Sequence, residues 1–134
     1  MKALKIDHIG IAVKNLDETL KFYTDVLGLE MGGTEVVEDQ KVKVAFLPIG
    51  DTEVELLEST SDDGPIARFI ERNGEGIQHI AFKVDDIEEA IDYMQEKGMK
   101  MINMHPKYGA GGAKIALVHP KSSHRVLVEL SQRD

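Results

Sequence analysis

Two histidines and two glutamates occupy matching positions in the two halves of this 134-residue chain. His8 and His79 each lie in the middle of a short segment in which apolar residues alternate with other types. Glu55 and Glu129 each stand directly before a leucine near the end of a half. Imidazole nitrogens and carboxylate oxygens are ligands for divalent Mn, Fe, Co, Ni and Zn. The four residues therefore predict a metal site, and on a six-coordinate ion they leave two positions for water or a chelating substrate.

The strands that must position these residues are repeated along the chain. The histidines lie in segments 6–13 and 77–84, whose alternation has the period of a strand. A lone histidine in a strand is more often a hydrogen-bonded core or surface residue than a ligand, but four residues at repeat-equivalent positions favour a common role. Further strands are predicted at 29–37, 41–49 and 52–58 in the first half, and at 114–118 and 127–131 in the second.

A helix is predicted after each histidine-bearing strand. Each begins with a capping pair and ends at a glycine: Asn15 and Glu18 with Gly28, and Asp86 and Glu89 with Gly98. The first of these helices, of about twelve residues, carries an apolar stripe that ends at Leu27. Because the second half repeats the plan of the first at an offset of 71 residues, we predict the order βαβββ twice, in a first module of about residues 1–60 and a second of about 75–134, joined by a linker helix at about 64–74.

Composition limits the classes of function. The chain has 42% hydrophobic and 30% charged residues, which is ordinary for a soluble globular protein, and no apolar run long enough to cross a bilayer. The first residues show no signal-peptide pattern, so we expect a cytoplasmic protein with no membrane partner. The net charge of -8 disfavours nucleic acid as a partner. Because the chain has no cysteine, zinc-thiolate sites and disulfides are excluded.

The positive charges are unevenly distributed. Between residues 97 and 128 there is no Asp or Glu, and the segment contains six cations: Lys97, Lys100, Lys107, Lys114, Lys121 and Arg125. A basic zone on an acidic protein is typical of a site for a small anionic ligand, although a chance run of solvated lysines is an equal alternative.

Three motifs carry a resemblance to a known family. The chain has D-H-I-G-I-A-V at its start, G-I-Q-H-I-A-F-K-V-D-D in the middle, and H-P-K-S followed by V-L-V-E-L near its end. This combination resembles the vicinal oxygen chelate superfamily and, within it, the methylmalonyl-coenzyme A epimerases, over essentially the whole chain. The resemblance implies a single α+β domain spanning 1–134, in which the tandem βαβββ modules form an open, curled eight-stranded mixed β-sheet around a metal site, with the helices outside.

The resemblance also implies an activity and a set of site residues. It implies an isomerase of propionate metabolism that epimerises (2R)- and (2S)-methylmalonyl-CoA by removal and return of the C2 proton through a metal-stabilised enolate. The divalent ion, with Co, Mn, Ni, Zn and Mg as candidates, would be bound by His8, Glu55, His79 and Glu129. Glu129 is expected to act as a base as well, with Glu55 as a second catalytic residue. Relatives resembling this chain are commonly dimers, so we expect a homodimer.

The second proton-transfer group is left open by the sequence. Inversion at C2 needs proton removal on one face and return on the other, hence two groups or one mobile group. Certain epimerases carry a glutamate at the position of Val44, which cannot move a proton. The alternatives are Glu55, Glu38, Gln40 with a bound water, and Lys43.

The acid-free segment supplies candidate contacts for the coenzyme A tail. Glycine backbone N–H groups and basic side chains suit phosphate, and the expected contacts are Gly111, Gly112, Lys114, Lys121, Ser122 and Arg125. The alternative is that segment 109–112 is simply a turn and the lysines are solvated. His105, His119 and His124 have no repeat partner and are predicted to lie in loops.

Other functions fit the same residues. A lyase resembling glyoxalase I would use two His and two Glu on a thiol hemithioacetal. A dioxygenase would need only two His and one carboxylate on iron, so the fourth predicted ligand argues against it. A small-molecule binding protein of the same fold would need no catalysis.

Overall fold

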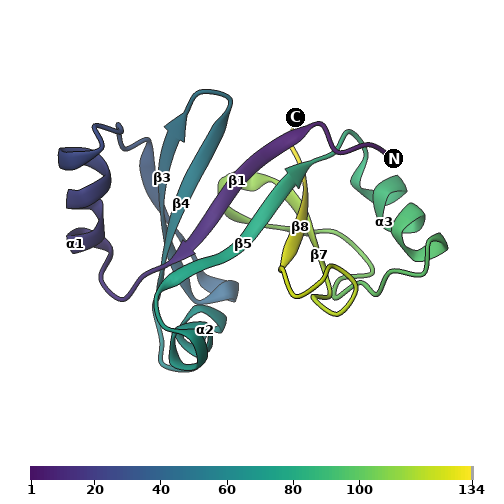
Figure 1. The fold of residues 1–134 in the computed structure, drawn as a ribbon. Helices are drawn as coiled ribbons and strands as arrows, with labels where there is room; N and C mark the ends of the chain where they lie inside the picture. The colour runs from purple at the N-terminus through teal and green to yellow at the C-terminus, as the bar shows by residue number, and fades with distance from the viewer. Residues whose placement is uncertain (134) are drawn as a thin grey trace. The chain divides into compact units, whose positions relative to one another are not determined.

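The computed structural model describes residues 1–133 (Figure 1). In the first half the elements are β1 (Lys5–Ala12), α1 (Leu16–Lys21), η1 (Phe22–Val26), β2 (Gly33–Val37), η2 (Glu38–Gln40), β3 (Val42–Ile49), β4 (Thr52–Ser59) and α2 (Pro65–Asn73). In the second half they are β5 (Gly76–Lys83), α3 (Ile87–Glu96), β6 (Lys107–Tyr108), η3 (Ala110–Gly112), β7 (Lys114–Val118) and β8 (Val128–Gln132). The described chain therefore has the order βαβββ twice, as predicted, with α2 as the linker helix.

The chain forms two compact units whose boundaries differ from those of the repeats. One unit, here called the histidine unit, combines residues 1–8 with the chain from His79 onward. The other, the Ile9–Gln78 unit, contains the rest of the first half. Strand β1 is divided between them, so His8 belongs to the same unit as His79 and Glu129. The organisation of residues 1–134 as one domain stays a prediction.

In the Ile9–Gln78 unit, the strands follow the order β2-β3-β4-β1. β1 pairs with β4 in parallel, whereas β2, β3 and β4 pair antiparallel. Helix α1 lies beside β4 (Figure 1) and covers one face of these strands. The core between them consists of Val13, Leu16, Ala45, Leu47 and Leu56.

In the histidine unit, the strands follow the order β1-β5-β8-β7-β6, with β5 and β8 parallel and β6, β7 and β8 antiparallel. Helix α3 packs on β7 and β8 (Figure 1). The core residues beneath it include Ile87, Ile91, Val118 and Leu130. The predicted α+β class, with eight strands in mixed pairing, is confirmed.

Both helix starts are capped as the sequence predicts. The side chain of Asn15 accepts a hydrogen bond from the Glu18 N–H at 3.0 Å, and Asp86 accepts one from Glu89 at 3.1 Å. A second pair of contacts was not predicted. Glu58 accepts from the Leu16 N–H at 2.7 Å, and Gln132, at the equivalent place in the second half, accepts from Ile87 at 2.9 Å. The last strand of each half thus satisfies the first backbone donor of its own helix, one of the four that a helix start leaves without an intrahelical partner.

The cap of α3 gives a direct test of this arrangement. An Asp86→Ala variant should lower the free energy of unfolding by about 1 kcal/mol, because the Glu89 N–H loses its acceptor. Urea unfolding measures the change, with Asp85→Ala, one residue outside the cap, as the matched control. Equal stability of the two variants would contradict the capping role.

The first helix has about the predicted extent, but its geometry changes along its length, and one predicted strand boundary is wrong. The first helix is α-helical only through Lys21 and continues as the π-helical turn η1. The Leu27 N–H donates to the carbonyl of Phe22, five residues back, so the wider turn rotates Leu27 off the apolar stripe and leaves it 55% exposed. The strand expected at 29–37 begins only at Gly33.

Candidate metal centre

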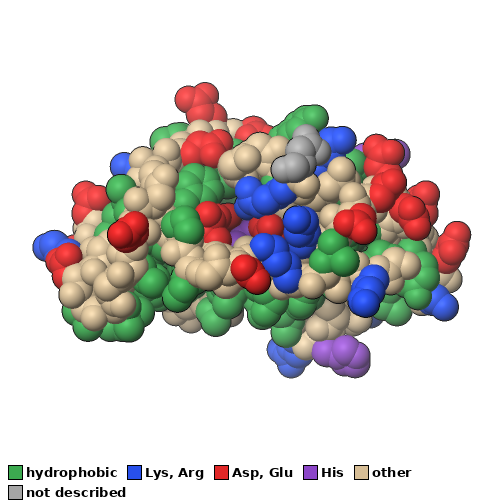
Figure 2. All heavy atoms as spheres, turned by 90° about the horizontal axis from the view of Figure 1, so that it is seen from above, with side chains coloured by type: hydrophobic (Ala, Val, Ile, Leu, Met, Phe, Trp, Pro, Cys, Tyr) green, Lys and Arg blue, Asp and Glu red, His purple; other side chains and the backbone are tan. Residues whose placement is uncertain are grey.

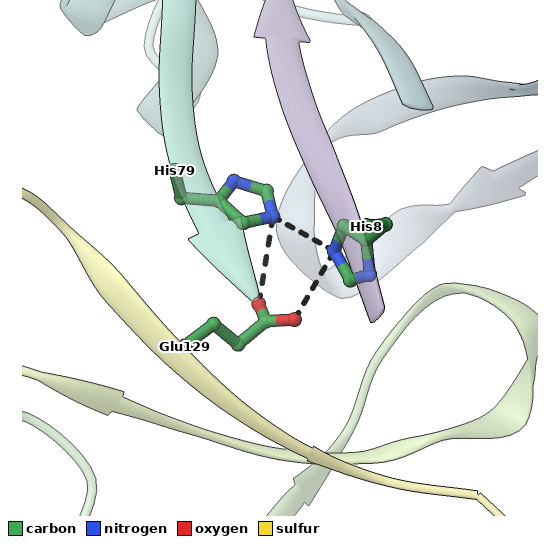
Figure 3. Close-up of side chains that lie close together, drawn as sticks. All are labelled: His8, His79 and Glu129. Atoms are coloured by element: carbon green, nitrogen blue, oxygen red, sulfur yellow. Dashed lines mark hydrogen bonds and ion pairs between the residues drawn. The ribbon is translucent and has the colours of Figure 1, made fainter. Parts of the chain in front are cut away.

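Strand pairing in the histidine unit brings His8 and His79 together. Leu4 at the start of β1 donates its N–H to the carbonyl of Lys83 at the end of β5, at 2.9 Å. His8 lies four residues after Leu4, and His79 lies four residues before Lys83. Antiparallel pairing from that contact therefore places the two histidines opposite each other. Figure 3 shows their rings pointing toward one another.

Glu129 completes a buried group with the two histidines. The Nε2 atoms of His8 and His79 lie 3.0 Å apart. Glu129 Oε2 lies 3.2 Å from His8 Nε2, and Oε1 lies 3.7 Å from His79 Nε2 (Figure 3). All three residues are less than 10% exposed, and one ligand atom from each lies within 4.8 Å of the others.

The alternation of β8 directs Glu129 toward the histidines. Its neighbour Leu130 is buried in the core beneath α3, so the preceding side chain must point to the opposite face of the strand. Ala81 pairs with Glu129 in the adjacent strand β5. The alanine side chain there is a single methyl group and is fully buried.

Asp7 and Arg133 form a second layer around His8, and sequence reasoning did not identify either of them. The Asp7 carboxylate accepts a hydrogen bond from His8 Nδ1 at 2.8 Å. Arg133 Nε lies 3.0 Å from Asp7 Oδ1 and 3.1 Å from Oδ2. One sequence signal was available, because Asp7 is the single acidic residue on the strand face that otherwise carries Ile9, Ile11 and Val13.

The charge states of these residues favour a ligand site. Burial alone would raise the pKa of Asp7, but the hydrogen bond from His8 and the Arg133 guanidinium outweigh it, so the pKa is lowered. Burial lowers the pKa of His79; Glu129 opposes this effect, and His8 adds to it. His79 is therefore a neutral imidazole at neutral pH, the form that can donate a lone pair to a metal.

The lowered pKa of His79 predicts how stability depends on pH. At pH values below 6.5, the ordinary pKa of histidine, His79 binds a proton in the unfolded chain but not in the folded metal-free protein. The free energy of unfolding should therefore fall as pH decreases from about 7.5 to about 5.5, by at most about 1.4 kcal/mol per pH unit for this one proton. Urea unfolding in the presence of a chelator measures the slope. His79→Gln should reduce that slope, and an unchanged slope would show that another group causes it.

The residues fit a divalent cation. Two imidazole nitrogens and a carboxylate converge, and one histidine donates its other ring N–H to a carboxylate, which is the usual surrounding of a metal-bound histidine. Such a donor set suits Mn, Fe, Co, Ni and Zn.

Glu55, the fourth predicted ligand, belongs to the Ile9–Gln78 unit. It is 3% exposed and pairs with Gly10 of β1 and Phe46 of β3, on the strand face opposite the α1 core. Its role as a ligand or base stays a prediction. Val44 is buried on that same face, because it pairs with Leu57, two residues beyond Glu55.

The other candidates for the second proton group are placed differently. Lys43 pairs with Glu58, whose carboxylate accepts from the start of α1, so Lys43 lies on the face opposite Glu55. Glu38 and Gln40 lie in the short turn η2. The Gln40 Nε2 atom is buried and has no hydrogen-bond partner in the described structure.

The predicted coenzyme A contacts fall at two places. Gly111, Gly112 and Lys114 lie at the start of β7, whereas Lys121, Ser122 and Arg125 lie in the turn after its end. Five strand residues separate the two groups by on the order of 13 Å. Some of the predicted donors and hydroxyls already have partners. Gly112 donates its N–H to Gly109 at 3.2 Å, and the Ser122 hydroxyl accepts from the Lys100 N–H at 2.8 Å.

The surface charge is mixed on the face that Figure 2 shows. Lysine and arginine side chains lie among aspartates and glutamates there, without forming a uniformly basic surface. Within residues 1–133, no helix is both long and apolar enough to span a bilayer.

Comparison with known proteins gives consistent matches. The family model of the glyoxalase/bleomycin resistance protein/dioxygenase superfamily matches residues 7–117. An ethylmalonyl-CoA/methylmalonyl-CoA epimerase of Cereibacter sphaeroides is 37% identical over 96% of this chain and 97% of that protein. The mitochondrial methylmalonyl-CoA epimerase of Bos taurus is 35% identical over 96% of this chain and 74% of that protein. A solved methylmalonyl-CoA epimerase in complex with methylmalonyl-CoA and NH4+ has a TM-score of 0.94 and 38% identity, over 98% of this chain and 95% of that chain.

Proposed function

The chain belongs to the glyoxalase/bleomycin resistance protein/dioxygenase superfamily, and from this premise we propose that it is an isomerase that epimerises methylmalonyl-CoA at C2. The observation that supports the proposal most is the buried group of His8, His79 and Glu129, in a chain similar along its length to curated epimerases. We propose these three residues, together with Glu55, as ligands of a divalent ion.

The substrate requires a base and a means to stabilise negative charge. Its C2 hydrogen lies between a carboxylate and a thioester carbonyl, and removing it places negative charge on the thioester oxygen. A bound divalent ion would supply the Lewis-acid chemistry that stabilises this charge. Glu129 is the residue that we propose to remove the proton, because it is the carboxylate in the group.

Glu55 is the group that we propose for the opposite face of C2. It shares a strand face with Val44, the position at which certain relatives carry a glutamate, whereas Lys43 points to the other face. Val44 of β3 pairs with Leu57 of β4, and Glu55 lies two residues before Leu57 on the same face. The Glu55 carboxylate can therefore take the place of a carboxylate at position 44 if the substrate lies over both positions. Proton return by Glu55 would then complete the inversion.

The activity is tested by proton exchange and epimerisation measured together. Purified protein with Co2+ and (2S)-methylmalonyl-CoA in deuterium oxide should incorporate deuterium at C2 and produce the (2R) epimer. The same protein should leave a glutathione hemithioacetal unchanged. Hemithioacetal loss without C2 exchange would support a lyase. If the protein catalysed neither reaction, the result would support a binding protein.

We propose that the turn after β7 binds phosphate groups of the coenzyme A tail. Val118, at the end of β7, pairs with Val128, which directly precedes Glu129, so this turn is closer to Glu129 than the glycine turn is. Lys121→Ala and Arg125→Ala should each raise the KM for the thioester several-fold with little change in kcat, because they remove charge that binds substrate and transition state alike. Lys97→Ala, which removes a cation at the C-terminal end of α3, is the control; equal KM values in all three variants would contradict the proposal.

We also propose that the protein is a cytoplasmic homodimer acting in propionate metabolism. The Ile9–Gln78 unit leaves several large apolar side chains about half exposed or more, among them Phe22, Val26, Leu27 and Val36. Such exposure is typical of a surface that another chain covers. Light scattering on the purified protein measures the mass, and a monomer at micromolar concentration would contradict the homodimer.

A further inference from the structure

The Asp7 carboxylate occupies an unusual position beside the candidate metal centre. Asp7 is 6% exposed, and the donors around it converge on both of its oxygens. His8 Nδ1 donates to Oδ2 at 2.8 Å, and Arg133 Nε contacts Oδ1 and Oδ2 at 3.0 and 3.1 Å. Asp7 acts on the centre through the His8 ring, because its Oδ2 accepts from Nδ1 while Nε2 of the same ring faces His79 and Glu129.

This contact decides which nitrogen of His8 carries the hydrogen. An ionised carboxylate can only accept, so the Asp7 contact requires the hydrogen to be on Nδ1. In a neutral imidazole, Nε2 then carries the lone pair. It is this Nε2 atom that lies 3.0 Å from His79 and 3.2 Å from Glu129.

We propose that Asp7 is a positioning residue for the metal centre: it holds His8 in the Nδ1–H tautomer with Nε2 directed at His79 and Glu129, and Arg133 fixes Asp7 in that orientation. The inference rests on the proposed metal site, and it adds two residues that touch neither the ion nor the substrate. A carboxylate behind a metal-bound histidine raises the donor strength of the ring and fixes its orientation.

Arg133 gives the arrangement its rigidity. Its Nε lies nearly equidistant from the two Asp7 oxygens, and its side chain is 31% exposed. The guanidinium keeps a positive charge at every relevant pH, so it holds Asp7 as an ionised acceptor. The pair links β1 to the residue that follows β8, the two strands that carry His8 and Glu129.

Asparagine at position 7 should be unable to replace the carboxylate, although it has nearly the same shape. His8 Nδ1 and Arg133 Nε both donate to the Asp7 side chain, and an amide has one acceptor oxygen. If the oxygen faces Arg133, the amide NH2 faces His8 Nδ1, which must then accept. The hydrogen moves to Nε2, and the lone pair that a metal needs is lost.

Two measurements test the proposal. Titration with Co2+, followed by calorimetry and by the visible absorption of bound Co2+, should show that Asp7→Asn binds about 10- to 100-fold more weakly than wild type. Arg133→Gln should lose affinity by less than about tenfold, because Asp7 keeps its hydrogen bond to His8. Asp92→Asn, the same substitution at an exposed position of α3, is the matched control and should bind as wild type does.

The second measurement needs no metal and no substrate. Long-range proton–nitrogen NMR of the metal-free protein distinguishes the two histidine tautomers. Wild type should show His8 with hydrogen on Nδ1, and Asp7→Asn should show hydrogen on Nε2. An Nε2–H tautomer in the wild type would overturn the proposal, as would Co2+ affinity within twofold of wild type in a folded Asp7→Asn variant. Both readouts remain decisive if the protein binds Co2+ but does not epimerise methylmalonyl-CoA, which would refute only the proposed function.

Discussion

A Glu129→Gln variant should fold normally and lose epimerisation of methylmalonyl-CoA by a factor of about 10² to 10⁴. Glutamine keeps the shape of the side chain and one ligating oxygen, but it cannot accept the C2 proton. Because Glu129 lies 3.2 Å from His8 Nε2 inside a buried group, no bulk water replaces it as a base. The measurement is the rate of C2 deuterium incorporation and of epimer formation in the Co2+-loaded protein.

The two epimers make the Glu129 test sharper. If Glu129 serves one face of C2, the variant should stop exchange with one epimer and retain slow exchange with the other through the second group. Glu88→Gln, the same change at an exposed position of α3, is the control and should leave both rates unchanged. Full exchange with both epimers in a metal-bound Glu129→Gln protein would remove Glu129 from the proposed role.

The second large effect should follow from removing either histidine. His8→Ala and His79→Ala should each weaken Co2+ binding by more than about 100-fold, beyond the roughly 10- to 100-fold expected for an outer partner. Each variant removes one of the converging nitrogens. Each substitution also leaves a cavity among buried groups. A smaller ion would not restore the affinity, because the missing nitrogen donor is not replaced. Calorimetric titration gives the affinity, and epimerisation should fall in parallel.

His105→Ala controls for the general loss of an imidazole, because His105 is exposed in a loop of the same unit. It should bind Co2+ as wild type does. If His8→Ala and His79→Ala also bound Co2+ with unchanged affinity, the ion would have to bind elsewhere, and the proposed centre would be wrong.

The histidine pair could be predicted because two kinds of sequence information agreed. Strand alternation places each histidine on one face, and the repeat relates the two strands to each other. Asp7 and Arg133 could not be found in that way. Their contact joins residues 126 positions apart, and neither has a counterpart in the other half of the chain. Only the position of Asp7 on the strand face that carries Ile9 and Ile11 indicated that it needed a partner.

The helix in the first half shows a different limit of sequence patterns. The stripe that ends at Leu27 fits an α-helix, but the chain forms a π-helical turn at Phe22–Val26. Over a short stretch, apolar residues three or four positions apart fit both an α-helical and a π-helical turn. The two turns differ by one extra residue, so spacing alone does not distinguish them. The caps were predicted correctly because Asn15 and Asp86 act on donors only three residues away.

The basic segment was predicted as one zone because it is continuous in sequence. Strand β7 divides it, since an extended strand moves its ends apart by about 3.3 Å for each residue. Lys114 and Lys121 therefore belong to different ends of the strand. Charge counts along a chain can suggest an anion site, and the strand boundaries decide how many of the charges one phosphate can contact.

Glu129 and Leu130 are consecutive residues of β8, one in the candidate centre and the other in the core beneath α3. A mutation that shifts β8 by one residue would exchange their faces, and it would destroy the core and the centre in the same event. Selection for new substrates therefore has little freedom within this strand. The turn from His119 to Val126 lies outside both the core beneath α3 and the candidate centre among the described contacts, so changes in affinity for the coenzyme A tail should accumulate there, and laboratory libraries aimed at that affinity should randomise this turn first.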